Sequence, residues 1–147
     1  MKVKFHYGLA GYSGKLDDLV YYFDKTAGSM FARRYRYPKL TQENERVKKT
    51  SGQLFAIEPS DAYKDNLRLY LMHYNGLKST AKPMRSWVNL YIHLMHKMAK
   101  AIPEVDLTTI TREQIYQHDF PCISVKRAVE AGLLQEVAGY ESMAAEI

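Results

Sequence analysis

The chain has 147 residues, of which 25% are charged and 46% hydrophobic, and it carries a formal net charge of +5 at pH 7. This ordinary globular composition excludes wholesale disorder and favours a single domain over residues 1–147. No apolar run reaches the roughly 18–20 residues that cross a bilayer, and residues 1–7 lack the apolar core of a signal peptide. We therefore expect no membrane association and no secretion by a signal peptide. Cys122 is the only cysteine, which excludes an internal disulfide and fits a reducing compartment.

The charge is unevenly distributed along the chain. Residues 1–50 carry a net charge of +6 and residues 51–102 carry +4, whereas residues 103–147 carry −5. A basic body of this kind favours contact with a polyanion. Alternatively, the basic part and the acidic C-terminal third attract each other, within one molecule or between neighbouring copies. The twelve tyrosines combine apolar area with a hydroxyl, which suits half-exposed sheet faces and interfaces.

The N-terminal third predicts a small antiparallel sheet. Residues 3–7 alternate apolar and polar side chains, as a half-buried strand does. Residues 19–23 are rich in β-branched and aromatic residues, and a turn cluster follows in which Gly28 supplies the left-handed position. The chain then returns as a second strand over residues 30–37. Pro38 ends this strand, because proline has no N–H for the ladder.

The second strand of this hairpin carries the densest basic and aromatic cluster in the chain. Alternation along a strand divides its side chains between two faces. One face receives Phe31, Arg33, Tyr35 and Tyr37, and the other receives Met30, Ala32, Arg34 and Arg36. The candidate contact residues are Lys15, Arg33, Arg34, Tyr35, Arg36, Tyr37 and Lys39. Lys2 and Lys4 extend this patch if the first strand pairs nearby.

Two kinds of partner suit this cluster of arginine and tyrosine. Arginine pairs with phosphate through a planar fork, and tyrosine stacks on bases or lies under a guanidinium. The same residue types are enriched at protein interfaces. Arginines on an edge strand also discourage pairing with the edges of other sheets. The cluster therefore predicts a nucleic-acid contact, a protein interface in an assembly, or a solvated face.

Helices follow the sheet, three long ones and then a short pair. Their predicted starts are Thr41, Ser60, Pro83, Thr111 and Ser124, and the predicted ends lie near Ile57, Gly76, Ile102 and Ala131. Residues 87–102 carry the strongest amphipathic stripe, and the spacing from Thr111 to Gln114 predicts a capping box. Residues 120–123 are expected to be extended around Pro121. The small, acidic segment 137–147 is expected to form a loose tail.

The histidines give a weak indication of a metal site. His93 and His96 lie three residues apart on one helix face, and such a pair can form part of a zinc site. However, no acidic residue lies near them, and Lys97 and Lys100 share their face and repel a cation. Only His73, if it lies close in space, favours a metal.

A thiol nucleophile is also weakly indicated. Cys122 and His118 are close in sequence, but the apolar residues Phe120 and Ile123 beside the thiol predict a small buried side chain rather than a nucleophile. No motif typical of nucleotide or cofactor binding is present in the sequence. We therefore expect no enzyme activity, no cofactor and no metal.

Four short motifs of the N-terminal third resemble a group of small uncharacterised proteins from bacteria, prophages and phages. The motifs are Ser13-Gly14-Lys15, Val20-Tyr21-Tyr22, Arg33-Arg34-Tyr35, and Pro38 followed by Thr41 and Asn44. Those proteins begin with a β-hairpin of this kind and continue with helices, and the resemblance covers about residues 8–48. It implies structural or DNA-handling roles associated with phages or mobile elements, and a cytoplasmic or virion-associated location. It implies no catalytic residues. The longer helical part and the acidic C-terminus of this chain depart from the short basic members of the group.

We therefore expect an α+β fold in which a small antiparallel sheet or hairpin over residues 1–39 packs with a predominantly helical part over residues 40–136. The leading hypothesis is a non-enzymatic structural or assembly protein, whose basic hairpin and acidic C-terminal third contact copies of itself or other structural proteins. The alternative hypothesis is a nucleic-acid-binding module that uses the same hairpin to hold DNA or RNA. Self-association that weakens with salt supports the first hypothesis, and binding whose logarithm falls linearly with the logarithm of salt supports the second.

Overall fold

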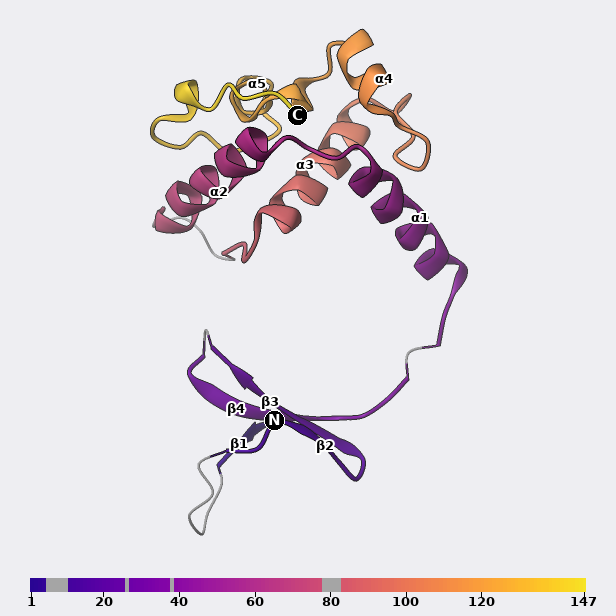
Figure 1. The fold of residues 1–147 in the computed structure, drawn as a ribbon, viewed down its shortest axis with the longest axis vertical. Helices are drawn as coiled ribbons and strands as arrows, with labels where there is room; N and C mark the ends of the chain where they lie inside the picture. The colour runs from indigo at the N-terminus through magenta and orange to yellow at the C-terminus, as the bar shows by residue number, and fades with distance from the viewer. Residues whose placement is uncertain (5–10, 26, 38, 78–82) are drawn as a thin grey trace. The chain divides into compact units, whose positions relative to one another are not determined.

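A four-stranded sheet occupies the N-terminal part of the chain, and helices make up the rest (Figure 1). The computed structural model describes residues 1–4, 11–25, 27–37, 39–77 and 83–147. The chain forms two compact units, Met1–Leu40 and Thr41–Ile147, and each is described here by itself. The predicted α+β class and the predicted change from strands to helices near residue 40 are both confirmed. The single domain over residues 1–147 stays a prediction.

The sheet has the strand order β1-β4-β3-β2, and every neighbouring pair is antiparallel. Its strands are β1 (Lys2–Val3), β2 (Gly14–Leu16), β3 (Leu19–Asp24) and β4 (Ser29–Arg34). The predicted hairpin is therefore the centre of the sheet, and β1 and β2 are short edge strands. Residues 5–7 of the predicted first strand lie outside the described residues.

Two turns fix the register of the sheet. Asp24 pairs with Ser29 at the end of the β3–β4 hairpin, and Gly28 has a φ of 57°, in the left-handed region that favours glycine, as predicted. The Asp24 carboxylate accepts a hydrogen bond from the backbone N–H of Ala27 at 3.2 Å. Between β2 and β3 the chain reverses through only two residues, of which Asp17 has a φ of 51°.

The prediction that the second hairpin strand runs to Tyr37 is wrong, because β4 ends at Arg34. Arg34 pairs with Leu19, which is the first residue of β3. Beyond this pair the neighbouring strand has already turned toward β2, so the ladder has no further partner. Tyr35 makes one last backbone contact, donating its N–H to the carbonyl of Asp18 at 2.6 Å.

In the described residues of the second unit, five α-helices and two 3-10 turns are formed. Their bounds are α1 (Gln42–Ala56), α2 (Asp61–Gly76), α3 (Trp87–Ala101), α4 (Arg112–Gln117), η1 (Pro121–Ile123), α5 (Val125–Glu130) and η2 (Tyr140–Ser142). Phe120 is extended as predicted, but the rest of the predicted extended segment is the turn η1, since residues 121–123 close a single 3-10 turn. None of the helices in the described part of the chain combines the length and apolarity needed to cross a membrane.

Most of these helices begin at the predicted caps. Ser60 and Ser124 each accept a hydrogen bond from the backbone N–H three residues later, and Thr111 forms the predicted capping box with Gln114. The predicted start of α3 at Pro83 is wrong. Ser86 caps that helix instead, because its hydroxyl accepts the N–H of residue 89.

Two buried tyrosines join the helices of this unit. The Tyr63 hydroxyl donates to the carbonyl of Cys122 at 2.9 Å, and the Tyr91 hydroxyl donates to the carbonyl of Leu54 at 3.0 Å. Their rings meet edge to face with centroids 6.4 Å apart. Burial raises the pKa of Tyr63, so its phenol stays a neutral donor. Each tyrosine thus fills the core and also satisfies a backbone carbonyl.

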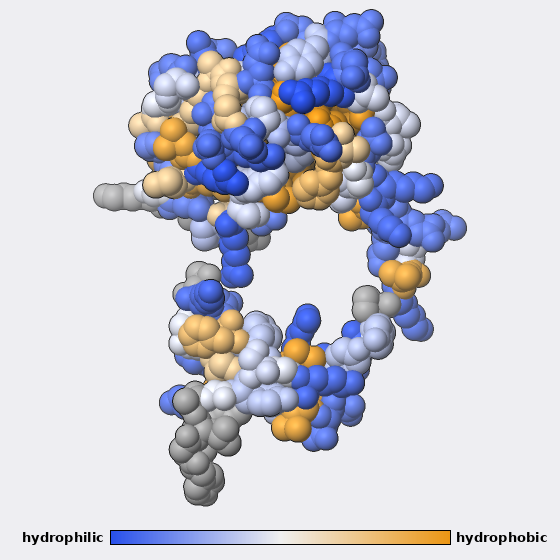
Figure 2. All heavy atoms as spheres, viewed as in Figure 1, coloured by the Kyte–Doolittle hydropathy of each residue, from blue (hydrophilic) through white to orange (hydrophobic). Residues whose placement is uncertain are grey.

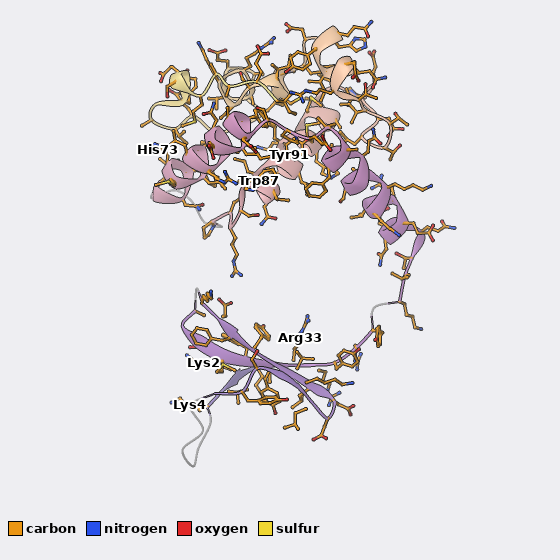
Figure 3. All side chains as sticks on the ribbon, in the orientation of Figure 1. Lys2, Lys4, Arg33, His73, Trp87 and Tyr91 are labelled. Atoms are coloured by element: carbon orange, nitrogen blue, oxygen red, sulfur yellow. The ribbon has the colours of Figure 1, made fainter. Side chains whose placement is uncertain are left out.

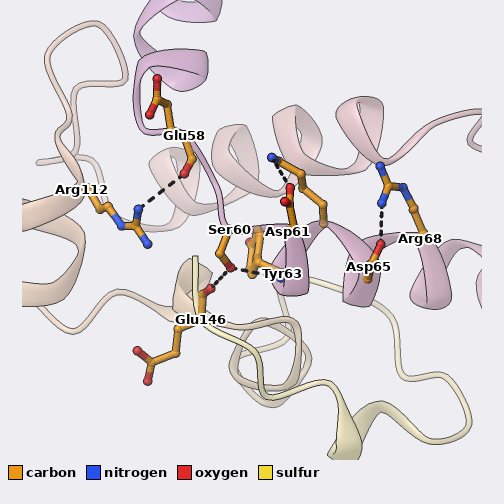
Figure 4. A network of polar contacts seen from close by, with 9 residues as sticks. Glu58, Ser60, Asp61, Tyr63, Asp65, Arg68, Arg112 and Glu146 are labelled. Atoms are coloured by element: carbon orange, nitrogen blue, oxygen red, sulfur yellow. Dashed lines mark hydrogen bonds and ion pairs between the residues drawn. The ribbon is translucent and has the colours of Figure 1, made fainter.

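The prediction of a loose tail over residues 137–147 is wrong. Met143 and Ile147 are 1% and 0% exposed, and Glu146 forms a β-bridge with Ser124. The Ser60 hydroxyl donates to the carbonyl of Glu146 at 2.6 Å, and Figure 4 shows this contact within a wider polar network. The backbone oxygen of Ile147 also accepts hydrogen bonds from Arg112 and Tyr116. Buried apolar side chains and backbone hydrogen bonds therefore hold this segment of small and acidic residues on the helices.

Met143→Ala tests whether this segment is packed. We expect the substitution to lower the free energy of unfolding by about 2–5 kcal/mol, because it opens a cavity under a fully buried side chain. Denaturant unfolding followed by circular dichroism measures the change. The matched control is Met72→Ala on α2, where the side chain is 74% exposed and the change should stay within about 0.5 kcal/mol. Equal stability of the two variants would contradict the packed tail.

Candidate functional site

The register of the sheet places basic and aromatic side chains on one face. Directly paired residues of neighbouring strands point to the same face, as do residues two apart along a strand. Lys2 pairs with Phe31, Phe31 pairs with Tyr22, and Arg33 is aligned with Lys15 through Val20. We call the surface formed by Lys2, Lys15, Val20, Tyr22, Phe31 and Arg33 the basic–aromatic face.

An aromatic pair lies at the middle of this face. The rings of Tyr22 and Phe31 stack across β3 and β4, with centroids 6.0 Å apart and planes 24° apart. Lys2 lies beside Phe31 on the other side, so one row across the sheet runs from Tyr22 through Phe31 to Lys2. Tyr22 is 41% exposed, which leaves part of its ring open to a ligand.

Lys15 joins the face to the segment that follows β4. Its ammonium lies 4.1 Å from the centroid of the Tyr35 ring, a cation–π contact. Tyr35 in turn meets Tyr37 edge to face at 5.2 Å. A side-chain hydrogen bond with Tyr37, together with desolvation, raises the pKa of Tyr35, so the phenol beneath Lys15 stays neutral. The predicted aromatic residues of this segment are thus held beside the sheet by contacts outside the ladder.

The opposite face of the sheet is covered in part by the chain itself. Tyr12 packs edge to face on Tyr21 with ring centroids 5.8 Å apart. A Cβ added at Gly11 would lie 3.8 Å from the sulfur of Met30, so the backbone before β2 also passes close to this face. Ala32 points to the same side and is only 3% exposed. The described residues therefore cover the opposite face near Tyr21 and Ala32, whereas Phe23 on that face stays 53% exposed.

The predicted contact residues divide into three groups. Arg33 and Lys15 lie in one row of the basic–aromatic face, and Tyr35 contacts Lys15. Arg34 belongs to the opposite face, although it is also exposed. The predicted strand positions of Arg36 and Tyr37, with Lys39 after them, fall in the connection to α1 and therefore outside the sheet.

Sequence reasoning missed the stacking of Tyr22 on Phe31. Both residues were in predicted strands, but their contact depends on the number of residues in the turn between Asp24 and Ser29. Gly28 marks the left-handed position of this turn and could have fixed the turn length. When Asp24 pairs with Ser29, Tyr22 lies opposite Phe31. Lys2 was expected to extend the patch if the first strand pairs nearby. That condition is met, because β1 pairs with β4.

The net charge of +5 comes entirely from the unit that contains this face. Met1–Leu40 has eight Lys/Arg and three Asp/Glu, a net charge of +5, whereas Thr41–Ile147 has thirteen of each. Within the described residues, no ion pair involves Arg33, Arg34 or Arg36. Figure 3 labels Arg33, Lys2 and Lys4 on this unit, and Figure 2 shows hydrophilic and hydrophobic side chains interspersed at its surface.

The histidines do not form a metal centre in the part of the chain that the structure describes, where no group of three potential His, Cys, Asp or Glu ligands occurs. His93 and His96 are both exposed on α3. Desolvation, followed by the nearby charges of Lys97 and His96, lowers the pKa of His93. The lysine on this face therefore disfavours a cation, as the sequence predicted.

Cys122 lies in the core, as predicted. The residue is 0% exposed, and burial raises the pKa of its thiol to about 12. His118 stacks on Phe120, with ring centroids 5.4 Å apart. A thiol in these surroundings stays protonated at neutral pH and is a poor nucleophile.

Comparisons with protein-family models, with curated proteins and with solved structures find no match to this chain. The resemblance of residues 8–48 to phage-associated proteins therefore stays a prediction. The basic–aromatic face is the feature of the described residues that bears most directly on function.

Burial of Cys122 predicts slow reaction with a thiol reagent. With a pKa of about 12, only about one thiol in 10,000 is ionised at pH 8, and the reagent has no access to the buried sulfur. We expect Ellman's reagent to label the native protein at a rate set by unfolding and to label one thiol per chain at once in denaturant. Native labelling at the rate of a free cysteine would contradict the buried position.

Proposed function

We propose that the protein is a non-enzymatic nucleic-acid-binding module whose basic–aromatic face holds the polyanion. The observation that carries the proposal is a set of cations on one face of the sheet, beside the stacked rings of Tyr22 and Phe31. Among the described residues these cations, Lys2, Lys15 and Arg33, form no ion pair. Cations without an ion-pair partner can replace the counterions of a phosphate backbone. Aromatic rings between them offer area on which bases can stack.

The charge distribution supports this proposal over a solvated face. A unit of 40 residues with a net charge of +5 repels itself, and a bound polyanion removes that repulsion. Arginines at a sheet edge can be explained by protection against edge pairing. The register pairs β1 with β4 only at Met30 and Phe31, so that side of β4 is open at Arg33. Protection of this edge does not account, however, for the stacked Tyr22 and Phe31 rings on the same face.

Self-assembly is a second candidate, and the acidic C-terminal third favours it. Glu130, Glu136 and Glu141 lie close enough to Tyr140 that they add to the effect of desolvation and raise its pKa. This acidic cluster complements the basic sheet of a neighbouring copy. The double variant Glu136→Gln, Glu141→Gln tests the contact by size-exclusion chromatography with light scattering. Assembly predicts an oligomer at low salt that the double variant weakens, and a monomer at low salt contradicts it.

Arg33→Ala tests the proposed nucleic-acid contact. We expect anisotropy titrations of a labelled oligonucleotide to give a linear fall of log K with log salt, and the variant to reduce the magnitude of that slope by about 0.7–1. The reason is the loss of one cation that contacts phosphate. The measurement is repeated at several potassium chloride concentrations.

The control for this titration is Lys126→Ala on α5, which removes the same charge from the second unit. Lys126 lies 4.0 Å from Glu130 and belongs to no part of the basic–aromatic face. Its removal should leave the salt slope unchanged. The proposal fails if no oligonucleotide binds at low salt, or if the two variants lose affinity equally, because the second result would mean that net charge alone attracts the polyanion.

A further inference from the structure

We infer that the basic–aromatic face takes single-stranded rather than duplex nucleic acid, with a base stacked on Tyr22 and phosphates at Lys2, Lys15 and Arg33. This inference rests on the proposed function and names the class of ligand for the same face. DNA and RNA single strands share the chemistry that the face recognises, which is an unpaired base next to a phosphate.

The position at which a base would stack follows from where strand β2 begins. Phe31 covers one side of the Tyr22 ring, and Lys2 lies on the far side of Phe31. On the other side of Tyr22 the sheet has no strand residue in the same row, because β2 begins at Gly14, which pairs with Tyr21. A base that enters there continues the aromatic row. Each such stack contributes strongly to binding and tolerates any base, because every base has a π-face.

The cations lie where the backbone of a stacked strand would pass. Arg33, Val20 and Lys15 form the neighbouring row of the same face, one pleat repeat of about 7 Å along the strands from the Tyr22 row. Lys2 closes the Tyr22 row at the other edge of the sheet. A strand whose base lies on Tyr22 therefore has a positive side chain in its own row and two in the next. Val20 between those two is apolar. Asp24 is also on this face, in the row on the other side of Tyr22, where its carboxylate accepts the Ala27 N–H.

A duplex uses this face poorly. The major groove, about 12 Å wide, admits a two-stranded β-ribbon, whereas each row of this face spans three strands. The face therefore cannot enter the groove broadside. In a duplex the bases already stack on one another, so the Tyr22 and Phe31 rings would gain no partner. Only the phosphate contacts would remain.

The test compares the affinities of three ligands for the 147-residue chain, each measured by anisotropy titration at the same salt concentration. The probes are labelled dT20, labelled U20 and a 20-base-pair DNA duplex. We expect each single strand to bind at least about tenfold more tightly than the duplex, and Tyr22→Leu to weaken single-strand binding by roughly fivefold or more while leaving duplex binding unchanged. Tight binding of either strand supports the inference.

The matched control is Phe23→Leu, the next residue along β3. Phe23 is 53% exposed and points to the opposite face, so this variant loses a similar ring without touching the proposed site. Circular dichroism checks that both variants fold. If Tyr22→Leu does not fold, the wild-type chain crosslinked to a 5-iodouracil oligonucleotide and mapped by mass spectrometry supplies the result, with adducts expected at Tyr22 or Phe31.

The outcomes separate the two proposals. Equal binding of duplex and single strand, or equal losses from Tyr22→Leu and Phe23→Leu, would overturn the single-strand inference while leaving nucleic-acid binding in place. Adducts confined to the second unit would also overturn it. Failure of all three probes to bind would end the proposed function, and the inference with it.

Discussion

The pairing of Asp24 with Ser29 sets the chemistry of the N-terminal unit, because it fixes the register of the central hairpin. Side chains alternate between faces with a period of two, so a slip of one residue would exchange the two faces of a strand. In the observed register Arg33 lies with Tyr22 and Phe31, while Arg34 lies on the opposite side. The candidate site is therefore a consequence of one four-residue turn.

The sheet and the helical unit use charge in different ways. In the second unit, acidic and basic residues are equal in number and several pair directly, as Asp119 and Arg127 do at 2.5 Å. That pairing lowers the pKa of Asp119, so the carboxylate stays charged and bound. Among the described residues, the arginines of the sheet unit, Arg33, Arg34 and Arg36, form no such pair. A unit with no net charge is thus joined to a small basic one.

Local signals predicted the elements well but not the contacts between them. The sequence alone located four local signals, because each acts through hydrogen bonds or backbone angles within a few residues. These signals are Gly28, Ser60, Thr111 and Ser124. The end of β4 depends on where a different strand turns, which no pattern inside residues 30–37 encodes. The packing of Met143 and Ile147 was missed because two apolar residues among small and acidic ones show no helical or strand period. The stacking of Tyr22 on Phe31 required the register as well as the strands.

Nuclear magnetic resonance offers the most direct test of a nucleic-acid contact on this face. A nitrogen-15 labelled sample is titrated with a short thymidine oligonucleotide, and backbone amide shifts are followed by residue. We predict that the largest changes fall at Lys15, Tyr22, Phe31 and Arg33 and that the helices of the second unit stay unchanged. Changes confined to the second unit, or no changes at low salt, would contradict the assignment of function to the basic–aromatic face.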